Sequence, residues 1–316
     1  MGADLYRSGE TFELTMRIGI DLGGTKIEGI LMDREGNVAE VIRLAAPREQ
    51  YDQTVQTISE LVRELDDEAG IKCPVGIGTP GAWISNRSVM KNCNSTWLNG
   101  RPLLDDLIKS LSRPVRIAND ADCFSLSEAV AGAGRESKCV FGIILGTGVG
   151  GGWVMNGRLL VGPNRLSGEW GHTPLPYFRS DRHGTSAEAD LPDRECYCGR
   201  TNCVETFLSG PGLSLTHRLL TGENREADTV AGSEFGERSY ALYTSMLART
   251  LAQIINVIDP DIIVCGGGIS NSNYLYRDLP VKVAEYAFTS EGTTQIVPAE
   301  HGDASGARGA AWLNPA

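Results

Sequence analysis

The sequence has no stretch that could cross a membrane and no excess of positive charge. No run reaches the roughly 18 uninterrupted apolar residues that a membrane helix needs. The N-terminal MGADLYRSGETFELT lacks the apolar core of a signal peptide. A formal net charge of −11 is opposite in sign to the basic surface of a nucleic-acid-binding protein. These absences predict a cytoplasmic protein that binds neither membranes nor nucleic acids. An acidic protein can still bind a small anion through backbone amides and a bound metal ion.

Cysteine is not scarce, since the 316 residues include 8 of them. In a cytoplasmic chain, reduced thiols or metal ligands are expected instead of disulfides. Three of the cysteines stand close together near residue 200 and are treated below. The other five are scattered in apolar or mixed surroundings and are predicted to be small buried thiols: Cys73, Cys93, Cys123, Cys139 and Cys265.

The length of the chain exceeds what one hydrophobic core usually supports, so two domains are expected. Segments of strand character alternate with segments of helical periodicity, which is typical of an α/β protein with a partly parallel sheet. The polar, proline-containing stretch 173–195 is predicted to be a loop. Strands are predicted at 16–22, 26–33, 38–46, 74–79, 115–118 and from 261, and helices at 51–68, 103–111, 121–132, 236–258 and 305–313.

Two strand–turn–strand segments resemble each other. RIGIDLGGTKIEGILMDREGN (17–37) and VFGIILGTGVGGGWVMNGRLL (140–160) share an apolar strand, a Gly/Thr turn, a second strand and a closing turn with Asn and Gly. Such internal similarity predicts a duplicated domain. We expect a small α/β domain over 16–119 to which the helix 305–313 returns, a large α/β domain over 120–304, and a flexible leader over 1–15.

Three glycine-rich turns each follow an apolar strand. Glycine lets backbone N–H groups approach a phosphate closely and adopt positive φ angles, so such turns are candidate phosphate sites. One such turn alone is more often a plain hairpin turn, but three at strand ends favour a nucleotide site. Asp21 is expected to hold Mg²⁺ through water, because hard cations prefer carboxylate oxygen. The candidate residues are Asp21, Gly23, Gly24, Thr25, Lys26, Gly146, Thr147, Gly148, Gly266, Gly267 and Gly268.

None of these turns has the sequence of a common nucleotide-binding loop. The phosphate loop GxxxxGK[ST] is not matched by any of them. The residues 146–151 fit GxGxxG in their letters, but they lie inside a strand–turn–strand and do not open a helix. This placement argues against a dehydrogenase.

VRIANDAD (115–122) places two polar residues at the carboxyl end of a strand, where α/β proteins bind ligands. Asp120 suits a base that accepts the proton of an attacking hydroxyl, and Asn119 suits a hydrogen-bonding partner of neighbouring hydroxyls. The alternative is that Asn119 or Asp120 only caps the following helix. Asp122 could equally be an acidic residue of the first turn of that helix. The local sequence does not decide between these alternatives.

A histidine and three cysteines are clustered in the second half of the chain. His172 precedes Cys196, Cys198 and Cys203. A Cys₃His set matches tetrahedral zinc, and because no open fourth position is evident, the predicted zinc site is structural. The alternative is a coincidental group of thiols. Three other histidines lie outside this spacing and are interpreted as ordinary surface or loop residues: His183, His217 and His301.

Two glutamates flank this cluster. Glu169 lies three residues before His172, and Glu205 lies two residues after Cys203. A zinc ion that clamps the segment would fix both carboxylates, which are then expected to accept hydrogen bonds from sugar hydroxyls. The alternative for each is a surface or capping glutamate.

Together these motifs resemble the ROK family of bacterial-type sugar kinases over about residues 16–313. DLGGTK and LGTGVGGG look like the two phosphate motifs of that family, VCGGGIS looks like its adenosine motif, and GEWGH with CYCGRTNCVE looks like its sugar and zinc signature. The resemblance implies an actin/hexokinase-like (ribonuclease H-like) duplicated two-domain fold with a central cleft, and ligands that include ATP, Mg²⁺ and a structural Zn²⁺. A homodimer is expected. By the resemblance, Asp120 is the base, zinc is bound by His172 with Cys196, Cys198 and Cys203, and the sugar is contacted by Asn119, Glu169, His172 and Glu205.

Within the family, KNCNSTWLNG (91–100) and GEWGHTPLP (168–176) look most like the manno(fructo)kinase branch. The N-acetylglucosamine kinase branch is the near alternative. The expected reaction is transfer of the γ-phosphate of ATP to the 6-hydroxyl of fructose or mannose, with Asn94 contacting the sugar and Gly81 approaching its ring. Two features depart from the common pattern of the family: the stretch between His172 and Cys196 is long, and Asp122 stands where Asn is frequent.

Two functions of other classes are weighed against the kinase. ROK relatives include sugar-responsive DNA-binding repressors, but only 15 residues precede the first predicted strand, too few for a helix-turn-helix, and the sequence has no basic patch. The second is a sugar sensor that has lost catalysis, against which the intact DLGGTK and Asp120 argue.

Overall fold

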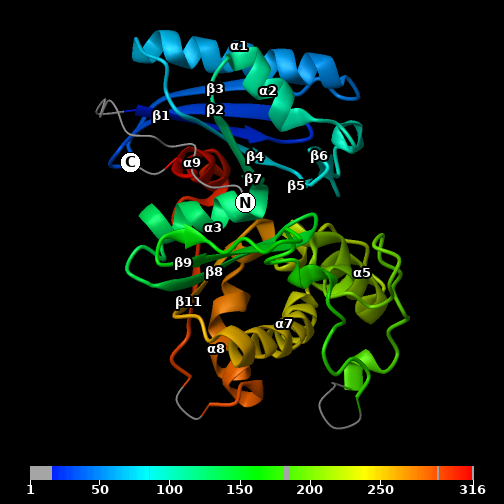
Figure 1. Cartoon of the computed structure of the whole chain (residues 1–316). Helices are drawn as coiled ribbons and strands as arrows, with labels where there is room; N and C mark the ends of the chain where they lie inside the picture. The colour runs from blue at the N-terminus through cyan, green and yellow to red at the C-terminus, as the bar shows by residue number, and fades with distance from the viewer. Residues whose placement is uncertain (1–15, 85, 181–185, 290–291, 315–316) are drawn as a thin grey trace. The chain divides into compact units, whose positions relative to one another are not determined.

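The computed structural model describes residues 16–84, 86–180, 186–289 and 292–314 (Figure 1). The described residues divide into two compact units: unit 1 contains those of 16–118 and 310–314, and unit 2 contains those of 119–309. The predicted leader over 1–15 and His183 lie outside the described residues. No helix in the described part of the chain is long and apolar enough to cross a membrane.

Helix α9 (Ser305–Trp312) is divided between the two units, which differs from the predicted return of the whole segment to the first domain. Its start is tied to unit 2, because Ser305 Oγ donates a 2.8 Å hydrogen bond to Glu128 and Gly309 lies directly on the backbone of Cys123. The chain after it belongs to unit 1, where the guanidinium of Arg17 donates to the carbonyl of Asn314 at 3.0 Å.

Unit 1 is built on a five-stranded sheet in the order β3-β2-β1-β4-β7. Its first three strands form an antiparallel meander, and β4 pairs with β1 in parallel. Helices α1 and α2 pack against each other over this sheet (Figure 1). The elements of unit 1 are β1 (Met16–Leu22), β2 (Lys26–Asp33), β3 (Val38–Ala45), α1 (Tyr51–Ala69), β4 (Val75–Thr79), β5 (Ala82–Ile84), β6 (Val89–Lys91), η1 (Thr96–Leu98), α2 (Leu103–Leu111) and β7 (Val115–Asn119), whose last residue begins unit 2.

Unit 2 repeats this topology in a second five-stranded sheet, with the order β10-β9-β8-β11-β12. Here β8 and β9 form an antiparallel hairpin, β10 continues it, and β11 pairs in parallel with β8 and β12. Both sheets therefore join an antiparallel hairpin to a parallel strand at the same position, as the internal similarity of the sequence predicts. The strands are β8 (Cys139–Leu145), β9 (Val149–Met155), β10 (Arg158–Leu159), β11 (Ile262–Gly266) and β12 (Gln295–Pro298).

The helices of unit 2 lie against this sheet and against each other. Helix α3 packs across β8 and β9, and α7 runs beside α8 (Figure 1). The helical elements are α3 (Asp120–Ala131), η2 (Trp170–His172), η3 (Ser186–Glu188), α4 (Glu205–Leu208), α5 (Gly210–Thr221), α6 (Ala227–Val230), α7 (Gly236–Ile258), η4 (Gly268–Asn271), α8 (Asn273–Tyr286) and η5 (Gly302–Ala304).

Each unit has its own hydrophobic core. In unit 1, aliphatic residues of β1, β2 and β4 meet those of α1 and α2. In unit 2, the core is richer in aromatic residues, and Phe141 stacks on Trp153 with ring centroids 4.0 Å apart. Of the five cysteines predicted to be buried thiols, four are buried, while Cys139 at the start of β8 is only half-buried.

One interpretation of a polar residue in unit 2 needs correction. His217 is not a surface histidine: it is fully buried in α5, and its Nδ1 lies 2.8 Å from Ser239 Oγ on α7. The predicted loop 173–195 contains the short helix η3, whose Glu188 forms a buried ion pair with Arg249 at 2.8 Å. His217 is inaccessible because the amphipathic faces of α5 and α7 turn inward, a feature that local spacing around a lone histidine does not reveal.

Candidate functional site

The residues Asn119 and Asp120 both serve the start of helix α3. The Asn119 side chain accepts a hydrogen bond from the backbone N–H of Ala121 at 2.9 Å, and Asp120 Oδ1 accepts one from the same N–H at 2.8 Å. The capping role that the sequence left open is therefore present. It fixes the Asp120 carboxyl group at the end of β7, and such an anchored carboxylate remains suited to proton transfer.

Asp122 is the most perturbed carboxyl group of this region. Burial raises its pKa to about 7, the negative charges of Asp120 and Glu169 add to the increase, and Arg165 opposes it. Its Oδ1 is buried without a hydrogen-bond partner among the described residues. A buried, unpaired carboxylate is costly, and the neutral acid avoids that cost. Three carboxyl groups thus interact in unit 2, and one of them favours its protonated form.

The segment GEWGH is held on strand β9 by close backbone contacts. A Cβ atom at Gly168 would lie 2.1 Å from the carbonyl oxygen of Gly151, and one at Gly171 would lie 2.2 Å from that of Val149. Only glycine fits at such distances. The indole N–H of Trp170 also donates to the carbonyl of Gly150 at 2.8 Å. These contacts set the positions of Glu169 and His172 at either end of the short helix η2.

His172, Cys196, Cys198 and Cys203 come together, with one ligand atom from each lying within 4.8 Å of the others. The Cys198 and Cys203 sulfurs are 3.6 Å apart, and His172 Nδ1 is 3.5 Å from Cys196 Sγ. For Zn–S bonds of about 2.3 Å and Zn–N bonds of about 2.0 Å, a tetrahedron has S···S edges of about 3.8 Å and N···S edges of about 3.5 Å. These two separations fit the edges of a tetrahedral metal site.

The protonation of these thiols is uneven. Burial opposes ionisation of Cys198, but hydrogen bonds from the backbone N–H of Arg200 and from the neighbouring thiols lower the pKa of Cys198 to about 6. Burial raises the pKa of Cys203 to about 12, and the Cys198 and Cys196 side chains add to the increase. These hydrogen bonds thus favour ionisation of Cys198 over that of Cys203, and a bound cation would favour ionisation of the others.

Tyr197, between two of the cysteines, occupies the other side of the His172 ring. Its hydroxyl oxygen lies 2.9 Å from His172 Nε2, and the two rings meet edge to face with centroids 5.0 Å apart. Although the Tyr197 residue is 80% exposed, desolvation of its hydroxyl and the charges of Glu205 and Glu169 raise its pKa to about 12. Both ring nitrogens of His172 therefore have partners.

Glu205 links the cysteine cluster to the second glycine turn. Its Oε2 accepts a hydrogen bond from the backbone N–H of Val149 at 2.9 Å, and a Cβ atom at Gly148 would lie 2.8 Å from the same oxygen. The turn is closed by a 3.0 Å hydrogen bond from Gly146 N–H to the carbonyl of Gly148, and Thr147 is exposed at its tip. One of the two predicted sugar-contacting glutamates thus supports a predicted phosphate turn.

The third glycine turn lies in unit 2, at the end of β11. Gly267 has a φ angle of +82°, and a Cβ atom there would lie 2.5 Å from the carbonyl oxygen of Leu145. Gly266 packs on the ring of Phe124, whereas Gly268 has open space around its Cα. Of these three residues, Gly268 therefore has backbone that a ligand can approach.

The first glycine turn belongs to unit 1, where it joins β1 to β2. Gly23 N–H donates to the carbonyl of Lys26 at 3.0 Å, and the Thr25 and Lys26 side chains are exposed. Burial, with a contribution from Glu28, raises the pKa of Asp21 to about 6. The Lys26 ammonium group lies 3.8 Å from the carboxylate of Glu28, so the two side chains form an ion pair.

The remaining predicted residues of unit 1, Gly81 and Asn94, lie at and after the β5–β6 hairpin. Asn94 is exposed, and Ser95 next to it lies against Gly24 of the first glycine turn. A Cβ atom at Gly81 would lie 2.5 Å from the carbonyl oxygen of Lys91. Gly81 is therefore required by packing within unit 1, a role that the sequence interpretation did not include.

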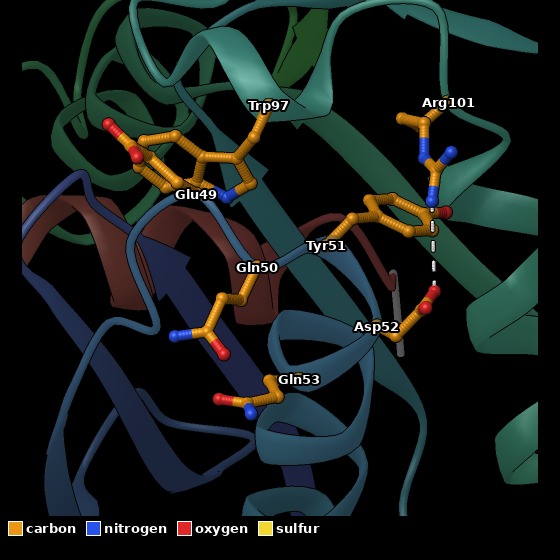
Figure 2. A pocket seen from close by; sticks show the side chains of 7 residues that line it. All are labelled: Glu49, Gln50, Tyr51, Asp52, Gln53, Trp97 and Arg101. Carbon is orange, nitrogen blue, oxygen red and sulfur yellow. Dashed lines mark ion pairs between the residues drawn. The ribbon is translucent and has the colours of Figure 1, made fainter.

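A pocket in unit 1 lies beside the start of α1 (Figure 2). Arg101 lies over the ring of Tyr51, 4.2 Å from its centroid, and also faces Asp52 at 3.7 Å (Figure 2). Trp97, from the NSTWLNG motif, forms another wall. None of the predicted site residues lines this pocket, so it gives no support to the predicted chemistry. The lining residues are Glu49, Gln50, Tyr51, Asp52, Gln53, Trp97 and Arg101.

Comparison with known proteins gives the family. The ROK family model matches residues 17–316. The chain belongs to the ROK family. It is 38% identical over 304 residues, 95% of its own length and 99% of the relative's, to the N-acetyl-D-glucosamine kinase of Pectobacterium carotovorum. It is 36% identical, with the same coverage of both chains, to the N-acetyl-D-glucosamine kinase of Vibrio cholerae.

Solved structures show the same fold. The ROK hexokinase of Thermus thermophilus superimposes with a TM-score of 0.80 at 26% identity, covering 94% of this chain and 97% of the other. A ROK family glucokinase from Streptomyces griseus, at 24% identity and a TM-score of 0.73, shares the fold as well. The protein is accordingly a ROK sugar kinase with the actin/hexokinase-like fold that the resemblance implies.

Proposed function

We propose that this ROK kinase transfers the γ-phosphate of ATP to the 6-hydroxyl of N-acetylglucosamine. The observation that carries this choice is the set of relatives at 36–38% identity over 95% of the chain, which are named N-acetyl-D-glucosamine kinases. This ranking reverses the sequence-based preference for fructose or mannose. The motif KNCNSTWLNG still favours those two sugars, so they form the second candidate.

Asp120 is the proposed general base. A sugar hydroxyl is a weak nucleophile, and its proton must be accepted as the oxygen attacks the γ-phosphorus. The hydrogen bond from Ala121 N–H holds Oδ1 of Asp120 in place. The residues proposed to orient the sugar hydroxyls are Asn94, Asn119, Glu169 and Glu205.

The glycine turns are proposed to bind ATP. Backbone N–H groups of the turns at Gly23–Lys26 and Gly146–Gly148 would face the phosphates, and Gly268 would leave room for the nucleoside. Asp21 is the proposed residue that holds Mg²⁺ through water. The magnesium ion, when bound, neutralises charge on the phosphoryl oxygens.

The His172, Cys196, Cys198 and Cys203 cluster is proposed to hold a structural zinc. The tetrahedral edges measured above support this assignment. The ion, when bound, cross-links η2 to the segment 196–203, and so stabilises the positions of Glu169 and Glu205.

The test is ADP formation with ATP and Mg²⁺, measured by a coupled assay for N-acetylglucosamine, fructose, mannose and glucose separately. We expect the highest kcat/KM for N-acetylglucosamine. A higher value for fructose or mannose would move the protein to the second candidate with the mechanism unchanged, and no turnover of any sugar by zinc-loaded protein would refute the kinase assignment.

The Asp120→Asn variant tests the base. We expect kcat to fall at least 100-fold, because general base catalysis of this kind contributes about 10²–10⁴-fold. Asp228→Asn, an exposed residue of α6, is the matched control and should retain wild-type turnover. Near-normal turnover of Asp120→Asn would exclude Asp120 as the base.

A further inference from the structure

An arginine from outside the glycine motifs lies against the first glycine turn. After β3, the backbone N–H of Ala46 donates to the carbonyl of Thr25 at 3.0 Å, which brings the following residues beside the turn. Two residues later, Nε of Arg48 donates to the carbonyl of Gly24 at 3.3 Å, and Arg48 is exposed. A cationic side chain is therefore held at a turn that is proposed to bind phosphate.

The charge of Arg48 is not neutralised by an acidic side chain, in contrast to the charges of its neighbours. Lys26 and Arg43 both form ion pairs with Glu28. Within the described residues, Arg48 forms no ion pair, and its contact with the Gly24 carbonyl occupies only one of the five N–H donors of a guanidinium group. The remaining donors can bind an anion in the bidentate way that suits phosphate.

Ser95 approaches the same glycine from another segment of unit 1. Its place is fixed by a short closed loop, in which the side chain of Asn99 bonds to the backbone of Cys93 and Leu98 N–H donates to the Ser95 carbonyl at 3.0 Å. Ser95 precedes η1, where a serine side chain commonly caps the helix, but it makes no capping bond. Its Oγ instead lies 3.3 Å from the position that a Cβ atom at Gly24 would take.

The hydroxyl group of Ser95 is buried but has no hydrogen-bond partner in the described part of the chain. Ser95 is only 3% exposed. A buried hydroxyl without a partner costs free energy, so a group from outside the chain is the natural partner. The other groups around Gly24, the guanidinium of Arg48 and the backbone amides of the turn, are donors. A partner that accepts hydrogen bonds from all of them is an anion such as a phosphoryl group.

We propose that Arg48 and Ser95 bind the phosphoryl group that ATP transfers, with Arg48 as a further catalytic residue. The bond between the γ-phosphorus and the oxygen bridging to the β-phosphorus breaks, a bond from the sugar oxygen to the γ-phosphorus forms, and the sugar proton passes to Asp120. Arg48 remains protonated throughout and stabilises the charge on the non-bridging oxygens, while the Ser95 hydroxyl donates to one of them. This inference rests on the proposed kinase function but not on which hexose is the substrate.

The experiment compares wild type with Arg48→Gln, Arg48→Lys and Ser95→Ala. The control is Arg63→Gln, which changes another exposed arginine that donates to a backbone carbonyl, that of Ser110 at 3.4 Å. For each protein we would measure kcat, KM for ATP and KM for the sugar. Calorimetry with Mg²⁺ would give the dissociation constants of ADP and of the non-hydrolysable β,γ-imido analogue of ATP, because only the analogue carries a γ-phosphoryl group.

Arg48→Gln should lower kcat about 100-fold, as expected for the loss of one donor to the charge that develops in transfer. It should also weaken binding of the imido analogue about 10-fold, with ADP and the sugar bound as in wild type. Arg48→Lys should recover part of kcat, because it keeps the charge but not the planar pair of donors. Ser95→Ala should weaken binding of the analogue about 3- to 10-fold without lowering resistance to urea, because its hydroxyl has no partner in the chain to lose.

An equal loss of affinity for ADP and for the imido analogue would overturn the proposal, since it would assign Arg48 to support of the turn through the Gly24 carbonyl. Wild-type kcat in Arg48→Gln would refute a catalytic role, and a rise of KM for the sugar alone in Ser95→Ala would place that hydroxyl on the sugar. The wild-type arm tests the kinase separately. Inactive wild-type protein refutes the proposed function, whereas active wild type with unaffected variants refutes only the roles of Arg48 and Ser95.

Discussion

Replacing Asp122 with Asn should make the protein more resistant to unfolding at pH 8 while having little benefit at pH 4.5. The folded-state pKa of Asp122 is raised to about 7, compared with about 3.9 for an unfolded aspartate. Between these two values the native state binds more protons than the unfolded state. The contribution of Asp122 to stability therefore falls as pH rises from about 4, and the full penalty is present above about pH 7.

The size of the effect follows from the shift. About 3 pKa units at 1.36 kcal/mol each give about 4 kcal/mol as an upper limit. The charges of Asp120 and Glu169 contribute to the shift, and both side chains can relax once the charge at residue 122 is removed. We therefore expect a smaller difference in unfolding free energy, about 2 kcal/mol. Asn has the shape of the protonated acid, and its amide can donate to the neighbouring carboxylates at every pH.

The assay is urea-induced unfolding followed by tryptophan fluorescence at pH 4.5, 6 and 8. The quantity of interest is the difference in unfolding free energy between Asp122→Asn and wild type, because carboxyl groups that do not interact with Asp122 titrate alike in both. This difference should increase with pH, while that of the exposed control Asp228→Asn should stay flat. A difference that does not change with pH, or an Asp122→Asn protein that is less stable than wild type at pH 8, would refute the assignment of a buried protonated acid.

Two further predictions concern zinc and the buried Glu128. Cys203→Ser should lose zinc measured by mass spectrometry and raise KM for both ATP and sugar, whereas Cys139→Ser, outside the cluster, should keep its zinc. Chelation of the wild-type metal should reproduce the Cys203→Ser effect, and unchanged KM values after zinc loss would contradict it. Glu128→Gln should lower the unfolding free energy by about 3 kcal/mol, because the buried carboxylate accepts bonds from the N–H groups of Ala133, Glu300 and His301 and from Ser305 Oγ. Urea unfolding measures this loss, and the exposed Glu136→Gln should show none.

Strong local patterns predicted the elements of the fold well. Strands β1 and β2 and helix α7 have the bounds expected from their apolar periodicity. Helix α5 was not predicted because it opens with Gly210, Pro211 and Gly212, and α8 was not predicted because it contains Pro280. Glycine at the start of α5 and a proline inside α8 disfavour helices locally, and tertiary packing of the apolar faces reverses that preference.

The candidate site shows the same division between local and tertiary information. The spacing of Cys196, Cys198 and Cys203 encodes the cysteine cluster directly, since nearby residues need only a short loop to converge. The pairing of His172 with Tyr197 could not be read from spacing, because it depends on which side of the imidazole faces the cysteines. The burial of Asp122 was equally hidden, since its neighbour Glu169 is 47 residues away in the sequence.

Glu205 explains why a structural metal would affect both substrates. It lies two residues beyond Cys203, so a zinc ion that fixes Cys203 also limits the freedom of Glu205. The same carboxylate accepts the Val149 N–H bond that supports the second glycine turn. Loss of zinc would release Glu205 from both positions, leaving a proposed phosphate turn without its support and a proposed sugar contact without its orientation. A structural zinc site can in this way influence the affinity for ATP and for the sugar, through one side chain that serves both.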